Sequence, residues 1–247
     1  MTHFVYGLHS ALARLEQDPA SIQEIWLQHQ PPKSKNTRLN QILQLAEKNQ
    51  CRVIWKDKQD IDRHTKQATH QGVLVFYDEP AALGEAYLKQ LLPTLTTAPL
   101  FLILDGVQDP HNLGACLRTA LGAGVDAVIA PKHRAVGMTA TVRKVACGAA
   151  EHVPFIQVTN LVRCMEWLKQ QGVWITGATL DTETSLYGID FRDPCAIVIG
   201  SEGKGARHLT LKHCDYLAKI PMGHQLASLN ASVASGVFLF EVVRQRQ

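Results

Sequence analysis

The residues that could do chemistry gather in three polar segments, each of which directly follows an apolar stretch of strand length. The first segment, 105–114, carries Asn112 and leads into an apolar helical pattern that contains Arg118. Asn is a favoured helix N-cap, so capping and catalysis are both open for Asn112. Arg118 has apolar neighbours, and a guanidinium in such a place needs an anionic partner. We therefore expect a carboxylate or a phosphate beside it.

The second segment, 200–206, ends a buried-looking strand with three glycines interleaved with Ser201, Glu202 and Lys204. Glycines allow a ligand to approach the backbone closely, and the start of a following helix offers free N–H groups. The glycine and lysine spacing of the Walker A motif is absent, so the pattern does not indicate a nucleoside triphosphate site. A ligand-binding turn and a merely tight strand-to-helix turn are both compatible with it.

The third segment, 218–234, passes from a strand through a loop into a helix of small residues that is predicted to start near Ser228. Ser228 would be its N-cap, and Asn230 and Ser232 would be ordinary first-turn residues. The small side chains that follow allow close packing against another backbone.

From residue 98 onward, apolar strands alternate regularly with amphipathic helices. The predicted strands are 100–105, 125–130, 153–158, 173–178, 196–200 and 216–220. The predicted helices are 112–121, 139–147, 161–171, 206–212 and 229–246. Near-continuous apolar strands separated by helices indicate an α/β fold with a mainly parallel sheet. Such sheets bind ligands outside the carboxyl ends of their strands, where all three polar segments begin.

The first part of the chain has the pattern of a smaller α/β unit, with helices at 10–17 and 38–49 and strands at 24–27, 52–55 and 73–76. An acidic, proline-bearing stretch with one short helical segment follows. We therefore predict three parts, with boundaries at 1–76 for the small domain, 77–97 for the linker and 98–247 for the larger domain.

The composition is that of a soluble globular protein, with 46% hydrophobic and 19% charged residues. The net charge of +3 is small, so any nucleic-acid binding must come from local patches. Membrane-spanning runs and an export signal are not visible, which predicts a cytoplasmic location. Six cysteines lack metal-ligand spacing, so we expect reduced thiols and no metal.

With these segments in view, the chain resembles the SpoU family of the SPOUT RNA methyltransferases. The matching motifs are 112–114 with 118–120, 199–203, and 220–222 with 228–232. The three motifs occur in order at predicted strand ends, which is far more specific than any one of them. Further matches at 5–11, 109–118, 144–151 and 240–246 extend the resemblance over nearly the whole chain. These segments are similar to those of SpoU family members that methylate the 2′-hydroxyl of a guanosine in 23S rRNA.

The resemblance implies a C-terminal trefoil knot, an L30e-like RNA substrate-binding domain at the N-terminus, and a homodimer formed through the catalytic domains. It implies that S-adenosylmethionine binds at Gly200, Ser201, Gly203, Ile220, Met222 and Leu229. The catalytic residues that it implies are Asn112, Arg118, Glu202, Ser228 and Asn230.

Methyl transfer to a ribose hydroxyl is an in-line displacement on a very weak acid, so the protein must align the oxygen and manage its proton. A guanidinium stays protonated and cannot be the base. We therefore expect Arg118 to orient the ribose and an adjacent phosphate and to stabilise negative charge on oxygen. Asn112 would fix Arg118 or the ribose, Glu202 would steer polar groups, and Ser228 with Asn230 would complete the pocket.

The implied substrate is a guanosine in the peptidyl-transferase (P-loop) region of 23S rRNA, free or in a large-subunit precursor. A tRNA or another rRNA site, and a non-catalytic RNA-binding or ribosome-assembly role, are the alternatives. Phosphate contacts would come from scattered basic residues, which give affinity without sequence choice. The candidates are Lys33, Lys35, Arg38, Lys132, Arg134, Arg143 and Lys144.

Overall fold

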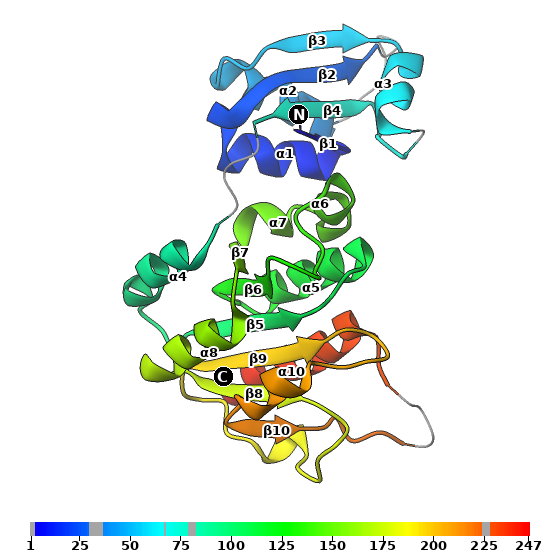
Figure 1. Cartoon of the computed structure of the whole chain (residues 1–247). Helices are drawn as coiled ribbons and strands as arrows, with labels where there is room; N and C mark the ends of the chain where they lie inside the picture. Colours follow the sequence, from blue (N-terminus) through cyan, green and yellow to red (C-terminus); the bar gives the residue numbers. More distant parts are fainter. Residues whose placement is uncertain (1–2, 30–36, 67, 79–82, 224–227) are drawn as a thin grey trace. The chain divides into compact units, whose positions relative to one another are not determined.

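The computed structural model describes residues 3–29, 37–66, 68–78, 83–223 and 228–247 (Figure 1). The chain divides into two compact units. Unit 1 comprises residues 1–81 and 140–152, and unit 2 comprises 82–139 and 153–247. The segment 140–152, which the sequence placed in the larger domain, thus packs with the N-terminal part, because its contacts lie there.

Unit 1 is built on a small mixed sheet in the order β1-β4-β2-β3. Its strands are β1 (His3–Tyr6), β2 (Ile22–Gln28), β3 (Val53–Lys56) and β4 (Val73–Tyr77). β4 is antiparallel to both β1 and β2, while β2 and β3 are parallel. The three strands predicted in this region are confirmed with shifted ends, and β1 was not predicted.

Helices cover both faces of this sheet. They are α1 (Leu8–Gln17), α2 (Thr37–Lys48), α3 (Lys58–Thr65), α6 (Ala140–Ala146) and α7 (Ala149–His152). α1 and α2 bury one apolar side against β1, β2 and β4. On the opposite face α3 packs through Ile61 against Leu74 and Phe76. α3 was not predicted, because only Ile61 and Thr65 of its eight residues are buried.

Unit 2 is built on a sheet in the order β10-β8-β9-β5-β6-β7, in which each neighbouring pair is parallel. Its strands are β5 (Leu100–Asp105), β6 (Ala127–Pro131), β7 (Phe155–Val158), β8 (Trp174–Ala178), β9 (Cys195–Gly200) and β10 (Tyr216–Ala218). The predicted α/β fold with a parallel sheet is confirmed. All residues of the central strands β5 and β9 are buried, as expected for a sheet covered on both faces.

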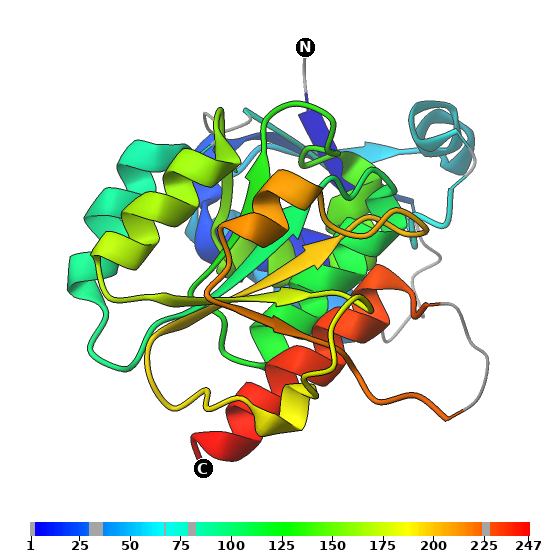
Figure 2. The same cartoon turned by 60° about the horizontal axis from the view of Figure 1, so that its bottom comes forward.

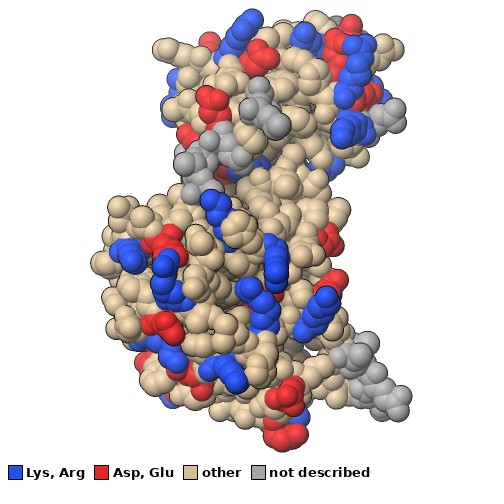
Figure 3. All heavy atoms as spheres, viewed as in Figure 1, with Lys and Arg blue, Asp and Glu red and all other residues tan. Residues whose placement is uncertain are grey.

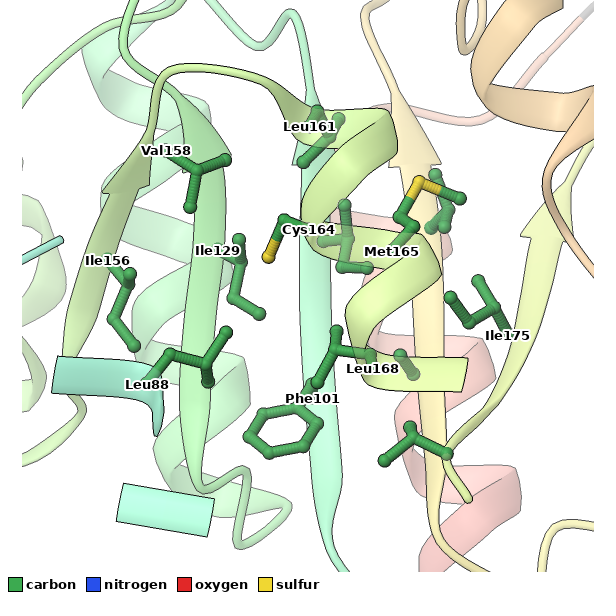
Figure 4. Close-up of a cluster of buried hydrophobic side chains, with 14 of the residues drawn as sticks. Leu88, Phe101, Ile129, Ile156, Val158, Leu161, Cys164, Met165, Leu168 and Ile175 are labelled. Carbon is green, nitrogen blue, oxygen red and sulfur yellow. The ribbon is translucent and has the colours of Figure 1, made fainter. Parts of the chain in front are cut away.

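The helices of unit 2 are α4 (Glu85–Leu91), α5 (Pro110–Gly122), α8 (Leu161–Gln170), α9 (His208–Lys212) and α10 (Ala231–Gln245). On one face, Cys164, Met165 and Leu168 of α8 pack on Phe101 and Ile129 of the sheet (Figure 4). The other face is covered by α10, which packs against α5 and β9 (Figure 2). This pairing brings the start of α10 to the first turn of α5.

Part of the stretch predicted as a linker is folded into unit 2. Leu83 forms a parallel bridge with Ile156. Leu88 of α4 is 1% exposed and belongs to the same core as α8. The helical segment recognised within this stretch is therefore a core helix, because its apolar side finds a partner far away in the sequence.

Candidate active site

A cavity of about 420 Å³ lies at the carboxyl ends of β8, β9 and β10. Its walls are the loops that follow these strands and the first turns of α10, including Ala234 and Phe238. This is the edge at which parallel sheets bind ligands. The second and third polar segments of the sequence therefore meet around one space.

The loop after β9 folds back tightly over the end of its own strand. Ser201 and Gly205 exchange backbone hydrogen bonds of 3.1 and 2.9 Å. Gly203 and Gly205 have φ values of 75° and 67°, which favour glycine. A Cβ on Gly200 would overlap the backbone of Gly205 and Ala206. The glycines are thus required for a loop whose backbone faces the cavity.

The start of α10 differs from the sequence prediction. The helix begins at Ala231 and its N-cap is Asn230, not Ser228. Asn230 Oδ1 accepts hydrogen bonds from Ser232 N at 2.9 Å and from Ser232 Oγ at 2.6 Å. Because these bonds occupy Oδ1, Asn230 Nδ2 points away as a donor. The N–H groups of Asn230 Nδ2 are therefore the atoms of this side chain that can bind other residues of the site.

Asn230 Nδ2 joins two of the other predicted catalytic residues. It donates to Asn112 Oδ1 at 2.9 Å and to Glu202 Oε1. Each of the three residues comes from a different polar segment of the sequence. We call Asn112, Glu202 and Asn230 the Asn–Glu–Asn network.

Asn112 is not the N-cap of its helix. α5 begins at Pro110 and is capped by Asp109, whose side chain accepts from His111 N at 2.9 Å. Asn112 lies inside the first turn, is 8% exposed, and turns its oxygen toward Asn230. The capping alternative for Asn112 is therefore wrong, and its Nδ2 donors are available for another partner.

Arg118 lies six residues beyond Asn112, roughly 9 Å along the axis of α5. It is exposed and forms no hydrogen bond or ion pair with any residue that the structure describes. The expected protein carboxylate is not found among those residues. The guanidinium is therefore accessible to an external anion.

The cavity gathers most of the residues that the sequence singled out. The predicted cofactor-binding residues all line it, namely Gly200, Ser201, Gly203, Ile220, Met222 and Leu229. Glu202 and Ser228 line it as well. Asn112 and Asn230 are linked to the cavity through Glu202, whereas Arg118 is not among its lining residues.

One wall of the cavity was missed from the sequence. Thr179, Leu180 and Asp181 follow β8 and line the space. These residues lie at the carboxyl end of a predicted strand, so the rule that located the other loops applies to this one too. It lacked the glycine spacing that drew attention to 200–206.

The basic residues predicted to grip RNA have different surroundings. Arg38, Lys132 and Arg134 are exposed, and Arg38 lies 2.8 Å from His9 Nε2. Lys144 Nζ donates to Thr69 O at 3.1 Å. Lys33 and Lys35 lie outside the described residues. On the face drawn in Figure 3, basic and acidic side chains are interspersed.

Arg143 differs from the other basic candidates because its side chain is only 6% exposed and pairs with Glu151 at 2.8 Å. Its guanidinium therefore serves the interior of unit 1, and we do not include Arg143 in an RNA-binding surface. The sequence did not reveal this pairing, because Arg143 and Lys144 are adjacent in a helical pattern that is typical of a basic surface.

The six cysteines are free thiols. Burial raises the pKa of Cys116 to about 11, so this thiol between α5 and α10 stays protonated at neutral pH. No group of His, Cys, Asp and Glu among the described residues could hold a metal ion.

Comparison with family models identifies the group to which this site belongs. The model of the SpoU rRNA Methylase family matches residues 99–240, which is more than half of the chain. The chain belongs to the SpoU rRNA methylase family. A second model, for RNA 2'-O ribose methyltransferase substrate binding, matches residues 4–82. The cavity and the Asn–Glu–Asn network fall inside the SpoU match, which confirms the resemblance inferred from the motifs.

Two individual relatives to which this chain is similar carry the same name. The 23S rRNA (guanosine-2'-O-)-methyltransferase RlmB of Pseudomonas putida is 46% identical, covering 98% of this chain and 96% of its own. RlmB of Neisseria meningitidis is 47% identical, covering 98% and 95%. The match therefore extends over both units.

Solved structures have the same fold. The SpoU methyltransferase AviRb of Streptomyces viridochromogenes, in complex with AdoMet, aligns with a TM-score of 0.81 at 20% identity, covering 99% of this chain and 90% of its own. An AdoMet-bound rRNA methyltransferase from Sinorhizobium meliloti gives 0.80 at 21% identity, covering 100% and 88%. At these identities the likeness establishes the fold alone.

Proposed function

We propose that this protein uses S-adenosylmethionine to methylate the ribose 2′-hydroxyl of a guanosine in 23S rRNA. The observation that carries the proposal is the Asn–Glu–Asn network, which joins three separate polar segments of the chain beside a cavity of about 420 Å³. The near-full-length similarity to RlmB proteins supports the choice of reaction and RNA.

The cavity fits a methyl donor of this size and chemistry. Gly200 lacks a side chain where one would collide with its own loop, so only backbone borders the space there. Gly200, Ser201 and Gly203 would hold the donor on one side, and Ile220, Met222 and Leu229 on the other. When bound, S-adenosylmethionine supplies an activated methyl group on a sulfonium.

The protein's own task is to place the ribose oxygen and to stabilise its developing charge. Arg118 is exposed and unpaired among the described residues, so it can bind a phosphate or an oxyanion. It remains protonated and acts as an electrostatic stabiliser rather than a base. Asn112 keeps its amide donors for the ribose, because its oxygen is held by Asn230. Glu202 accepts from Asn230 and orients the loop, and Ser228 lines the same pocket.

A homodimer formed through the catalytic domains would bring Arg118 to the partner's cofactor. Support comes from large apolar side chains left exposed on the paired helices α5 and α10. Leu121, Val233 and Phe240 are 43%, 50% and 51% exposed, and Leu121 follows Arg118 on α5. Exposed apolar groups of this size mark association surfaces. Gel filtration with light scattering at micromolar concentration tests this part.

The trefoil knot and the L30e-like character of the N-terminal unit are also proposals. The tight loop 200–206 and the described residues 218–220, 222, 228, 229 and 231 border the same cavity, which suits a threaded chain. The substrate-binding match over residues 4–82 supports an RNA-binding role for unit 1. The proposed domains are 1–76 for RNA binding and 98–247 for catalysis, joined by 77–97, although residues 82–97 pack with unit 2 and residues 140–152 with unit 1.

RNA contacts are assigned to exposed cations. Arg38, Lys132 and Arg134 are the candidates that the structure leaves at the surface, with Lys144 partly buried and Lys33 and Lys35 retained from the sequence. Each lost phosphate contact should reduce the salt dependence of RNA binding by about one unit of log–log slope. The reaction is placed in the cytoplasm, where ribosomes assemble. No helix among the described residues is long and apolar enough to cross a membrane.

Transfer of tritium from labelled S-adenosylmethionine tests the function directly. Free 23S rRNA, large-subunit precursor particles and tRNA are offered separately, and the modified nucleotide is mapped as a reverse-transcription stop. Methylation of one guanosine in the peptidyl-transferase region of 23S rRNA is expected. Incorporation into tRNA alone would assign a different RNA, and donor binding without incorporation into any RNA would favour an assembly role.

A further inference from the structure

Asp105 is a buried carboxylate at the carboxyl end of the central strand β5. It is not part of the Asn–Glu–Asn network. It is the last residue of β5, and its side chain is 0% exposed. In the sheet register it stands opposite Gly200, the last residue of β9. A buried carboxylate is tolerated only when donors saturate it. The residues that donate to Asp105 therefore show which part of the chain this carboxylate holds in place.

Among the described residues, the donors to Asp105 all belong to Arg207. Asp105 Oδ2 accepts from the backbone N–H of Arg207 at 2.8 Å. Asp105 Oδ1 accepts from Arg207 Nε at 2.7 Å and lies 2.5 Å from its terminal nitrogen. The carboxylate thus fixes both the backbone and the guanidinium of one residue.

The segment between Gly200 and Arg207 is the loop that walls the cavity. Gly200 is fixed by its sheet pairing beside Asp105, and Arg207 precedes the short helix α9. The backbone bonds between Ser201 and Gly205 tie the loop to itself, but they do not attach its second end to the sheet. The Asp105–Arg207 pair is a polar attachment at that end, next to Ala206, which packs into the core of the sheet.

We propose that Asp105 and Arg207 are positioning residues that clamp the 201–206 loop in the shape required for cofactor binding. Neither residue lines the cavity, so both act through the loop. The clamp also sets the place of Glu202, which must reach Asn230. The role in turnover rests on the proposed function, whereas the role in cofactor binding does not.

The test compares Arg207→Ala with wild type by calorimetric titration of S-adenosylhomocysteine, after thermal unfolding has established that the variant is folded. Arg207→Ala keeps the backbone N–H bond to Asp105 and removes the guanidinium. Affinity should fall at least tenfold. Affinity should fall less for Arg207→Lys, which keeps the positive charge but not the planar guanidinium. Affinity should fall most for Asp105→Asn, which removes the negative charge and replaces one of the two accepting oxygens by an NH2 donor.

Arg163→Ala is the matched control. Arg163 binds both oxygens of Glu85 at 3.0 and 3.1 Å and lies on α8, outside the cavity lining. Removing this pair should leave S-adenosylhomocysteine affinity unchanged. If folded Arg207→Ala binds the probe as wild type does, the clamp is rejected.

A double-mutant cycle on kcat distinguishes positioning from general stabilisation. If Arg207 acts through Glu202, the loss in the double variant Arg207→Ala, Glu202→Gln should be clearly smaller than the product of the two single losses. Multiplicative losses would reject that link. A wild-type enzyme inactive on 23S rRNA would overturn the proposed function, while the calorimetric comparison would still decide the clamp.

Discussion

Two polar clusters in this chain each pair a glutamate with nitrogen-bearing side chains, but they differ in burial. In unit 1, Arg14 and Arg143 both pair with Glu151, at 2.9 and 2.8 Å, and the three side chains are 2%, 6% and 7% exposed. At the carboxyl ends of the strands of the larger sheet, Glu202 and Asn230 are exposed, and Asn230 donates to both Glu202 and the buried Asn112. One cluster is closed and the other is open.

The difference lies in access, because the ionic cluster is buried whereas Glu202 of the network lines the cavity. The guanidiniums of Arg14 and Arg143 stack near the Tyr77 ring, at 4.0 and 5.2 Å, and Glu151 joins α7 to α1 and α6. In the Asn–Glu–Asn network, by contrast, a single amide orientation leaves donors of Asn112 unused. A closed ionic cluster contributes to the fold, whereas an open one beside a cavity can bind a substrate.

Breaking the closed cluster should have the largest effect on stability. Glu151→Gln removes the one carboxylate between two buried guanidiniums, so the free energy of unfolding should fall by about 3–5 kcal/mol. Urea unfolding measures the loss. Methyl transfer per folded molecule at low temperature should be retained, because Glu151 lies outside the cavity.

The matched control is Glu85→Gln, whose partner Arg163 is 65% exposed. Its loss should be about 0–1 kcal/mol. Equal losses of unfolding free energy for Glu151→Gln and Glu85→Gln would mean that burial does not determine how much an ion pair contributes to stability.

The open region is probed through Arg118. Arg118→Lys keeps the charge but loses the planar fork that can hold a phosphate and a ribose oxygen together. We expect kcat to fall on the order of 10²–10³-fold, as for loss of a transition-state donor. The urea midpoint should not move, since Arg118 has no partner among the described residues. Near-wild-type turnover by this variant would remove Arg118 from the mechanism.

Gly200→Ala tests the backbone wall of the open region. The added Cβ would collide with Gly205 and Ala206, and forcing the loop away should cost about 1–3 kcal/mol. S-adenosylhomocysteine binding should weaken in parallel. Gly188→Ala is the control, because a Cβ there meets nothing within 4 Å. Unaltered binding by a folded Gly200→Ala protein would argue against a cofactor beside this glycine.

The parallel sheet and the location of the site could be predicted because they rest on local patterns. The strand 100–105 was predicted with the bounds that β5 has, since its apolar run is continuous. The loops at 200–206 and 218–234 follow such runs, and the geometry of parallel sheets brings them together.

Long-range polar pairing could not be predicted. Arg14 and Glu151 are 137 residues apart, and Arg143 resembled any surface arginine until its burial was known. Helix starts were misread for a local reason. Ser228 and Asn112 are good caps by type, but Asp109 and Asn230 hold those positions, and Asp109 followed by Pro110 was an available signal.

The prediction with the smallest expected effect concerns Asn230 and distinguishes a role in helix capping from a role in catalysis. Asn230→Ala removes both functions and should cost about 0.5–2 kcal/mol of stability. Asn230→Ser retains a comparable cap but lacks the Nδ2 donor to Asn112 and Glu202. Its unfolding free energy should therefore stay near that of wild type while kcat falls as in the alanine variant. If serine restores both stability and turnover, Asn230 is only a helix cap, and the open cluster is as structural as the closed one.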